Sequence, residues 1–153
     1  MFVDRVNVEL IAGNGGDGMA SFRREAYVPL GGPYGGDGGK GGDIVVVADS
    51  NKSTLLDLRF NRIIKGSHGI PGKNKKMHGR DAEETIIRVP VGTIVTDVAQ
   101  GIVIADLTEV GQREVIAHGG RGGRGNVRFA TAKNPAPSFA EKGELGQSLE
   151  VMI

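Results

Sequence analysis

Glycine recurs at every third residue in parts of this chain, and this spacing limits what the chain can fold into more than any other feature. Glycine accounts for 26 of the 153 residues, more than twice its usual share of ~7%. Seventeen of these glycines fall in three windows, residues 13–18, 31–42 and 119–125. Neither an α-helix nor a β-strand has a period of three. The glycines that follow it include Gly32, Gly35, Gly38 and Gly41, and later Gly119, Gly122 and Gly125.

A three-residue period is typical of the polyproline II helix, which makes no internal hydrogen bonds. The backbone N–H groups of such helices must therefore bond to neighbouring segments or to water. The alternative is a flexible linker. Ordering seventeen glycines instead of alanines costs about 10–15 kcal/mol, so order requires sites that only glycine can fill. The strict period favours an ordered bundle of short polyproline II helices, and the seven glycines named above are expected to be structural.

The remainder of the chain predicts about eight short strands and almost no α-helix. Val6, Val8 and Leu10 alternate with polar residues, as in a half-buried strand. The best helix candidate, residues 19–28, is cut short by Pro29. The turn-rich spacing of the strands indicates a barrel or a sandwich. Further strands are expected at 43–49, 54–60, 84–89, 93–97, 102–107, 113–118 and 148–153.

Several classes of activity are excluded or disfavoured by the motifs. The chain has no cysteine, which removes disulfides, cysteine nucleophiles and cysteine zinc sites. The two Gly-x-Gly-x-x-Gly matches, at 13–18 and 120–125, lack the crossover helix of a dinucleotide site. No Gly-x4-Gly-Lys-Ser/Thr phosphate loop is present. The three histidines do not have metal-ligand spacing. We expect no catalytic residues and no metal site in this chain.

Positive charge is concentrated in two segments, although the net charge is only +1. Residues 59–80 carry seven bases and no acid, and residues 115–133 carry four bases and no acid. Basic loops are expected at about 65–80 and 126–139, and a third at 22–29 contains Phe22 and Tyr27. Bases interspersed with aromatic rings suit RNA, because cations meet phosphates and rings stack on unpaired bases. The alternative is that these loops are merely solvated and the chain is a protein-binding scaffold.

Long motifs in this sequence resemble the N-terminal domain of the Obg family of bacterial GTPases, over essentially the whole chain. The resemblance implies a single domain over residues 1–153, with glycine-rich polyproline II helices packed on a small eight-stranded β-barrel. It also implies a cytoplasmic, monomeric protein without membrane contact. The matching motifs are Phe2-Val3-Asp4, Gly15-Gly16-Asp17-Gly18, Tyr27-Val28-Pro29, Gly35-Gly36-Asp37-Gly38-Gly39-Lys40-Gly41-Gly42, Gly119–Asn126 and Asn134-Pro135-Ala136-Pro137.

By the same resemblance, the chain takes part in assembly of the large (50S) ribosomal subunit and in stress and growth control. Its partner would be the 23S rRNA near the peptidyl-transferase region, contacted by a tip of three loops. The residues expected to bind RNA there are Arg23, Arg24, Tyr27, Lys73, Lys75, Lys76, His78, Arg80, Arg128, Phe129 and Lys133.

Family members continue into a GTPase domain, and this chain is expected to stop just before it. GTP, magnesium and slow GTP hydrolysis would belong to that domain, so no cofactor and no catalysis are expected of this chain alone. The GTPase domain would also be a partner of this one. The competing hypothesis is a regulatory or protein-interaction scaffold for the GTPase domain or other proteins, without direct RNA binding.

Overall fold

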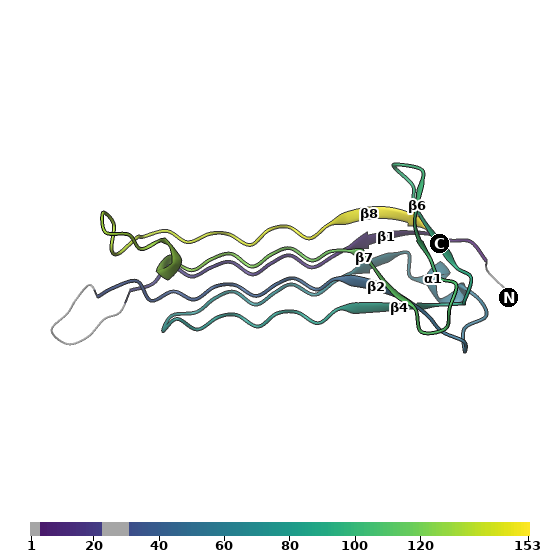
Figure 1. Ribbon diagram of the computed structural model, residues 1–153, viewed down its shortest axis with the longest axis horizontal. Coiled ribbons are helices and arrows are strands. Elements are labelled where there is room, and N and C mark those ends of the chain that lie inside the picture. Colours follow the sequence, from purple (N-terminus) through teal and green to yellow (C-terminus); the bar gives the residue numbers. More distant parts are fainter. Residues whose placement is uncertain (1–3, 23–30) are drawn as a thin grey trace.

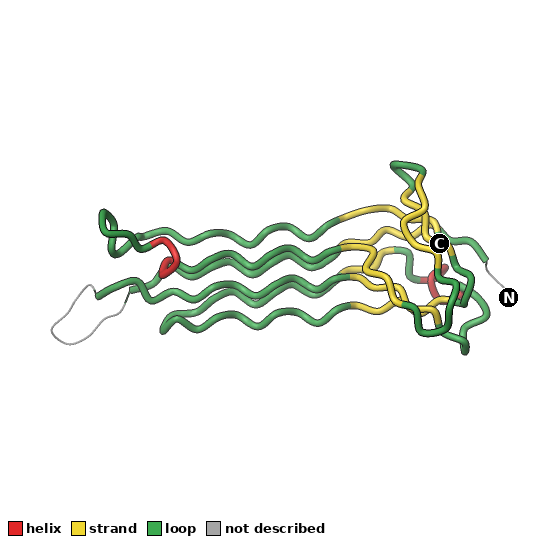
Figure 2. The backbone as a smooth tube through the Cα atoms, in the orientation of Figure 1, coloured by secondary structure: helices red, strands yellow, loops and turns green. Residues whose placement is uncertain are grey.

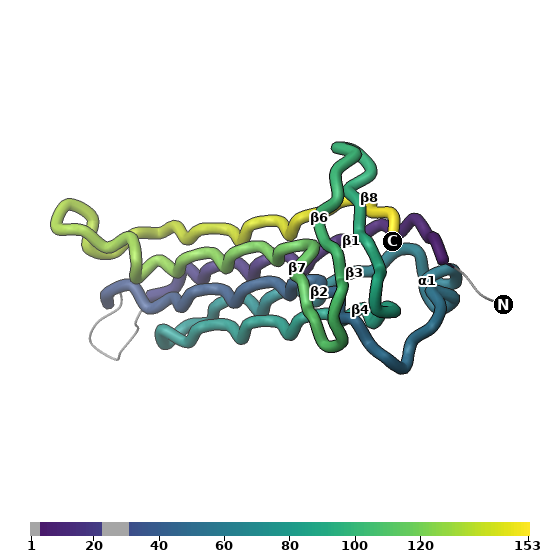
Figure 3. The backbone as a smooth tube through the Cα atoms, turned by 45° about the vertical axis from the view of Figure 1, so that its right-hand side comes forward, coloured from purple at the N-terminus to yellow at the C-terminus, as the bar shows by residue number. Residues whose placement is uncertain are grey.

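The computed structural model describes residues 4–22 and 31–153. It is an elongated molecule with its strands gathered at one end and long, gently waving segments running to the other (Figure 1). Figure 2 shows the same division, with strands in yellow at one end and loops in green along the length. The elongated form is also evident in the turned view of Figure 3. The C-terminal residue lies at the strand end.

Two mixed sheets form the strand end. The larger sheet has five strands in the order β3-β1-β8-β5-β6, and the smaller has three in the order β4-β2-β7. The strands and helices are β1 Asn7–Ile11, β2 Ile44–Ala48, α1 Leu56–Phe60, β3 Ile63–Lys65, β4 Thr85–Val89, β5 Ile94–Asp97, β6 Ile102–Asp106, β7 Arg113–Ala117, the 3-10 helix η1 Asn126–Phe129 and β8 Ser148–Met152.

The hydrophobic core lies between these sheets. Strand β1 places Val8 and Leu10 inward and polar residues outward, which is the alternation of a sheet with one solvated face. Strand β2 is instead buried almost throughout, because it pairs in parallel with β4 on one side and antiparallel with β7 on the other. Val95 and Val151 complete the same cluster from β5 and β8.

Seven of the expected strands are confirmed, and they are β1, β2, β4, β5, β6, β7 and β8. The expected strand at 54–60 is wrong, since Leu56–Phe60 forms helix α1. Leu55 and Leu58, three residues apart, are both buried, a spacing that fits a helix and not a strand. The short strand β3 was not expected, and it pairs in parallel with β1. The helix candidate at 19–28 lies mostly outside the described residues.

The expectation of a mainly β protein with almost no α-helix is confirmed, but the strands do not pair as one closed barrel. Among the described residues they form two separate sheets of five and three strands. Strands β6 and β7, at the edges of the two sheets, approach each other without forming a hydrogen-bonded pair. The domain therefore has the expected number of strands in a different arrangement.

Six extended segments form the long part of the molecule, and together we call them the glycine bundle. Apart from Thr85, the first residue of β4, and Asn126, the first of η1, they lie outside helices and strands. Each is joined to its neighbours by backbone hydrogen bonds at every third residue. For example, Gly36, Gly39 and Gly42 donate N–H groups to Lys73, Ile70 and Ser67. The segments are residues 12–19, 35–43, 66–73, 77–85, 118–126 and 140–147.

The segment 35–43 bonds to four of the other five. Its N–H groups at Gly38 and Gly41 donate to the carbonyls of Gly123 and Gly120. Its carbonyl groups accept bonds from segments 12–19 and 77–85. Every N–H group from Gly35 to Gly42 has a hydrogen-bond acceptor. Glycine-rich backbone without side-chain packing is thus held by complete pairing of its polar groups.

Side chains supply the acceptors for the N–H groups that face away from neighbouring backbones. Two histidines do so: His68 Nδ1 accepts from Asn14 N–H, and His78 Nδ1 accepts from Asp37 N–H, each at 2.9 Å. Carboxylates act in the same way, as where Asp43 accepts from Gly119 N–H at 2.7 Å. The polar residues between the glycines therefore complete the hydrogen bonding of the bundle.

Six of the seven glycines expected to be structural are at sites with no room for a side chain. A Cβ added at Gly38 would lie within 3.0 Å of the backbone carbonyl of Gly16. Gly32 is the exception, because an added Cβ there would meet nothing within 4 Å. The other five crowded positions are Gly35, Gly41, Gly119, Gly122 and Gly125.

The bundle extends beyond the three glycine windows of the sequence. Residues 65–80 were expected to be one basic loop, but only the turn near 74–76 is irregular, and segments 66–73 and 77–85 belong to the bundle. Gly66, Gly69 and Gly72 repeat the period of three there, and each has backbone within 3.0 Å of an added Cβ. The three-residue period of glycine therefore marks the segments of the bundle better than the local density of glycine does.

We expect Gly38→Ala to destabilise the protein by at least about 3 kcal/mol, because its methyl group would force two backbones apart. Gly32→Ala is the matched control, and its unfolding midpoint should stay equal or rise slightly. Thermal and urea unfolding followed by circular dichroism measure both. Equal stability of the two variants would contradict the close approach of segments 35–43 and 12–19.

Candidate nucleic-acid interface at the tip

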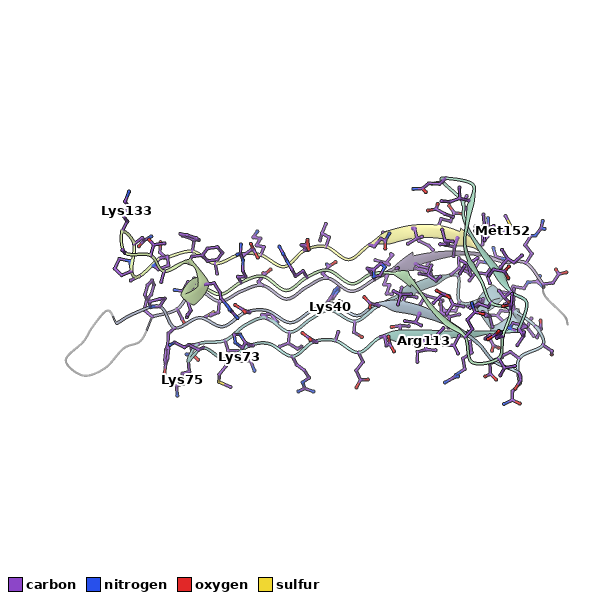
Figure 4. All side chains as sticks on the ribbon, viewed as in Figure 1. Lys40, Lys73, Lys75, Arg113, Lys133 and Met152 are labelled. Carbon is purple, nitrogen blue, oxygen red and sulfur yellow. The ribbon has the colours of Figure 1, made fainter. Side chains whose placement is uncertain are left out.

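The end of the bundle opposite the strands carries the candidate site, which we call the tip. It consists of the turn at 73–77 and the segment 126–139. Figure 4 labels Lys73 and Lys75 from the turn and Lys133 from the segment, all at this end, with Met152 at the other. Two of the three expected loops thus lie at the same end. Arg23, Arg24 and Tyr27, from the third, lie outside the described residues.

The turn at 73–77 has an unusual backbone. Lys75 and Lys76 have φ angles of 59° and 54°, in the left-handed region. Met77 donates its N–H to Asn74 at 3.3 Å, and Lys73 donates to Met77 at 2.9 Å. The two lysines thus occupy central positions of a tight turn of the kind that normally takes Asn-Gly. Left-handed backbone costs about 1–2 kcal/mol for each residue with a side chain.

Asn126, at the start of η1, ties the tip together. It is the one fully buried polar residue among those described, with no exposed surface. Its Oδ1 accepts from Gly35 N–H at 2.9 Å, and its Nδ2 donates to the carbonyls of Ser21 at 2.9 Å and Pro137 at 3.0 Å. Sequence reasoning missed this residue, because nothing local indicates that these partners meet.

Arg128 lies at the tip but shares its charge with Asp37. Its guanidinium donates to the two carboxylate oxygens at 2.7–3.3 Å, and Asp37 also accepts from Gly125 N–H at 2.8 Å. Burial alone would raise the pKa of Asp37, but the hydrogen bonds from Arg128 and Gly125 outweigh it and hold the pKa below its ordinary value of 3.8. His78 Nδ1 lies 3.6 Å from Asp37 Oδ2. Arg128 and His78 thus both support the bundle around Asp37.

Two phenylalanine rings form a small aromatic cluster beside η1. The rings of Phe129 and Phe139 have centroids 5.0 Å apart. Arg124 stacks over Phe129 at 4.9 Å and donates to Glu141 at 3.0 Å. Phe129, expected to meet RNA, is half-buried, while Phe139 is 52% exposed. Phe139 is therefore the ring that is more accessible for stacking. Its position in a basic, proline-rich segment is the sequence feature that could have identified it.

The lysines of the tip differ from Arg124 and Arg128 in having no ion-pair partner among the described residues. Lys73, Lys75, Lys76 and Lys133 are exposed, and none forms an ion pair with another residue in the described ranges. Arg80 is also exposed, but it lies back from the turn, where its carbonyl accepts from Ile70 N–H. The tip therefore presents several uncompensated ammonium groups near exposed apolar and aromatic side chains. Such a surface attracts polyanions.

No group of three or more His, Asp or Glu side chains that could hold a metal ion occurs within residues 4–22 and 31–153. The Gly-x4-Gly-Lys-Ser/Thr phosphate-loop sequence is also missing from the chain. None of the helices in the described part of the chain is long and apolar enough to cross a membrane.

The geometry defines a class of protein: a hydrogen-bonded, glycine-rich rod built on a small β module, with a basic tip. The comparison with protein families specifies it further. Residues 3–153 match the family model described as GTP1/OBG, and the chain belongs to this family.

Curated relatives agree with this assignment. The proteins named GTPase Obg from Listeria monocytogenes and Streptococcus pneumoniae are 59% and 56% identical to this chain over all 153 residues. The same name is given to a Streptococcus sanguinis protein that is 56% identical. The chain spans 36% of the Listeria relative and 35% of each Streptococcus relative, so it is similar to about a third of each.

We expect Asn126→Ala to lower the free energy of unfolding by at least about 2 kcal/mol, because it leaves buried partners at Ser21, Gly35 and Pro137 without hydrogen bonds. Asn134→Ala is the matched control in the same segment, since that side chain is exposed and forms no hydrogen bond with the described residues. It should change stability by no more than about 0.5 kcal/mol. Urea unfolding measures both, and equal losses would contradict the role of Asn126.

The ionisation of Asp37 predicts how the stability of the protein depends on pH. Because its folded pKa is depressed, its ionised form stabilises the protein above pH ~4, and this contribution is lost as pH falls through the folded pKa. Asp37→Asn should therefore be less stable than the wild type at about pH 7, with the gap closing toward about pH 2.5. The difference in stability between the wild type and Arg128→Leu should also decrease as the pH falls over this range. A gap that urea unfolding finds constant over this range would refute the assignment.

Proposed function

We propose that this chain is an RNA-binding module that anchors a GTP1/OBG-family protein to the large ribosomal subunit. The observation that carries the proposal is a collection of lysines that have no ion-pair partner among the described residues and lie at one end of the rod, far from the strand end. A rod of this kind can carry a small basic surface into a narrow, RNA-lined space. Phosphate contacts by lysine supply affinity without sequence preference, and the exposed ring of Phe139 adds a surface for stacking.

The strained turn at 73–77 supports the same proposal. Glycine at positions 75 and 76 would form this turn without steric strain, and the chain has lysine at both. Strain of this kind persists where a function depends on the side chain. Two adjacent ammonium groups at the end of the rod are the functional gain that offsets the cost.

Other parts of the proposal concern the longer protein. The relatives bear the name GTPase Obg, and this chain is similar to about a third of each. We propose that GTP, magnesium and hydrolysis belong to the remaining two thirds, and that the whole protein acts in large-subunit assembly and growth control in the cytoplasm. We also propose that the six extended segments are polyproline II helices, which the period of their hydrogen bonds supports.

A protein-interaction scaffold is the competing function, and salt dependence separates the two. RNA binding through several phosphate contacts weakens steeply with salt, with a log–log slope of roughly −0.7 to −0.9 per contact. A protein interface that buries apolar surface responds less. The strand end does expose apolar side chains, among them Ile102 and Val103 on β6, and these would be the surface of such a scaffold.

The test is co-sedimentation of the chain with purified large and small ribosomal subunits over a salt series. The variant is Lys75→Gly/Lys76→Gly, which removes both ammonium groups while relieving the left-handed strain. We expect it to melt at the same or a higher temperature than the wild type, yet to bind the large subunit more weakly, with a salt slope lower in magnitude by about 2.

Lys142→Ala, which removes an exposed lysine from the side of the bundle, is the control and should bind like the wild type. The design separates binding from folding, because the double variant gains stability as it loses affinity. Unchanged binding of the double variant, or equal binding to both subunits, would overturn the proposal that the tip is the anchor.

A further inference from the structure

Two hollows at the tip share one wall residue, Tyr34. The first, of about 570 Å³, is lined by Ala20, Ser21, Phe22, Tyr34, Asn74 and Lys75. The second, of about 270 Å³, is lined by Gly32, Pro33, Tyr34, Lys76, Val127 and Ala130. The first falls within the ~300–1,000 Å³ of small-molecule sites, and the second lies just below, which suits a single ring system.

Backbone hydrogen bonds join Tyr34 to two other parts of the chain. Its N–H donates to the carbonyl of Ser21 at 2.7 Å, and its own carbonyl accepts from Lys76 N–H at 2.7 Å. A β-bridge between Phe22 and Pro33 flanks it. An aromatic side chain on a fixed backbone is a preorganised stacking surface, because little conformational entropy is lost when a ligand binds.

The strained turn gives each hollow one ammonium group. Lys75 lines the first hollow and Lys76 the second. Both have left-handed φ angles, and the two consecutive lysines line different hollows. Each hollow is thus lined by Tyr34 and by one lysine. The two neighbouring hollows therefore repeat the same pair of features, an aromatic residue and a positive charge.

Ser21 fixes one wall of the first hollow through its backbone. Its carbonyl accepts from Tyr34 N–H at 2.7 Å and from Asn126 Nδ2 at 2.9 Å.

We propose that the tip binds two consecutive unpaired nucleotides of RNA, one in each hollow, with their bases against Tyr34 and their phosphates at Lys75 and Lys76. This inference rests on the proposed RNA-binding function and adds the form of RNA that is recognised. A duplex does not fit, because its bases are already stacked and paired inside the helix. A single strand offers a π-face and a phosphate at each step, and the repeated arrangement matches this pattern.

Tyrosine fluorescence tests the proposal directly. The chain has two tyrosines and no tryptophan, so in Tyr27→Phe the emission comes from Tyr34 alone. The probes are a ten-nucleotide oligouridine and a blunt RNA duplex of the same length. We expect the single strand to quench most of the emission of Tyr27→Phe and to bind at least tenfold more tightly than the duplex. The same titration of Tyr34→Phe, in which only Tyr27 emits, measures the part of the wild-type quenching that comes from Tyr27.

Anisotropy with labelled oligouridine completes the test. Tyr34→Ala should bind roughly 10- to 100-fold more weakly, the loss expected for a stacked base, and Tyr34→Phe should bind within about twofold of the wild type because it keeps the ring. Circular dichroism confirms folding of each variant, and the quenching measurement stands even if Tyr34→Ala fails to fold.

Three results would overturn the inference. If Lys75→Gly/Lys76→Gly weakens RNA binding while Tyr34 emission is never quenched, the tip binds phosphates only, and the proposed function stands without this site. If uridine monophosphate quenches as well as the ten-mer, the hollows hold a free nucleotide instead. If neither RNA binds and ribosomal subunits do not bind either, the proposed function and this inference both fail.

Discussion

The close approach of glycine backbones is the interaction on which the structure depends. Where Gly38 faces the carbonyl of Gly16, no side chain fits between the two segments. This proximity lets each segment of the bundle exchange hydrogen bonds with several neighbours at once. A segment without internal bonds has two kinds of N–H group to satisfy, those that face neighbouring backbones and those that face outward. The first kind is met by carbonyls and the second by side chains such as His78 and Asp43.

The strand end and the bundle are stabilised by different interactions. The strand end buries apolar side chains such as Val8 and Leu10, and the hydrophobic effect supplies its stability. The bundle buries few side chains, so it relies on the pairing of polar groups and on a fixed register. All six of its segments are continuous with strands: β1, β3 and β7 lead into three of them, and the other three lead into β2, β4 and β8. The sheets thus set the lateral order and register of the segments at one end, and hydrogen bonds at every third residue carry that register to the tip.

Much of this architecture could be predicted from the sequence, because it follows from local patterns. The alternation at Val6, Val8 and Leu10 predicts β1, and the period of three predicts close packing at Gly38. The prediction was wrong at Gly32, which keeps the period but lies outside the hydrogen-bonded segment. The role of Asn126 depends on residues 21, 35 and 137 meeting in space, and no local signal reports that. The left-handed backbone at Lys75 could not be predicted from the sequence either. Such turns are normally recognised by a glycine at a central position, and this turn has lysine there.

The positive charge of the tip follows from the way in which the bundle uses its polar residues. Outward N–H groups need acceptors, so carboxylates such as Asp37 and Glu141 are committed to the backbone and to the arginines that accompany them. No corresponding need exists for ammonium groups. At the turn, moreover, the backbone of Lys73 and Met77 closes its own hydrogen bonds, so the side chains between them have no structural task. Acidic residues along the rod are therefore engaged in hydrogen bonds and ion pairs, while the lysines at its end remain exposed. A chain with a net charge of only +1 can in this way present a concentrated positive surface at one place.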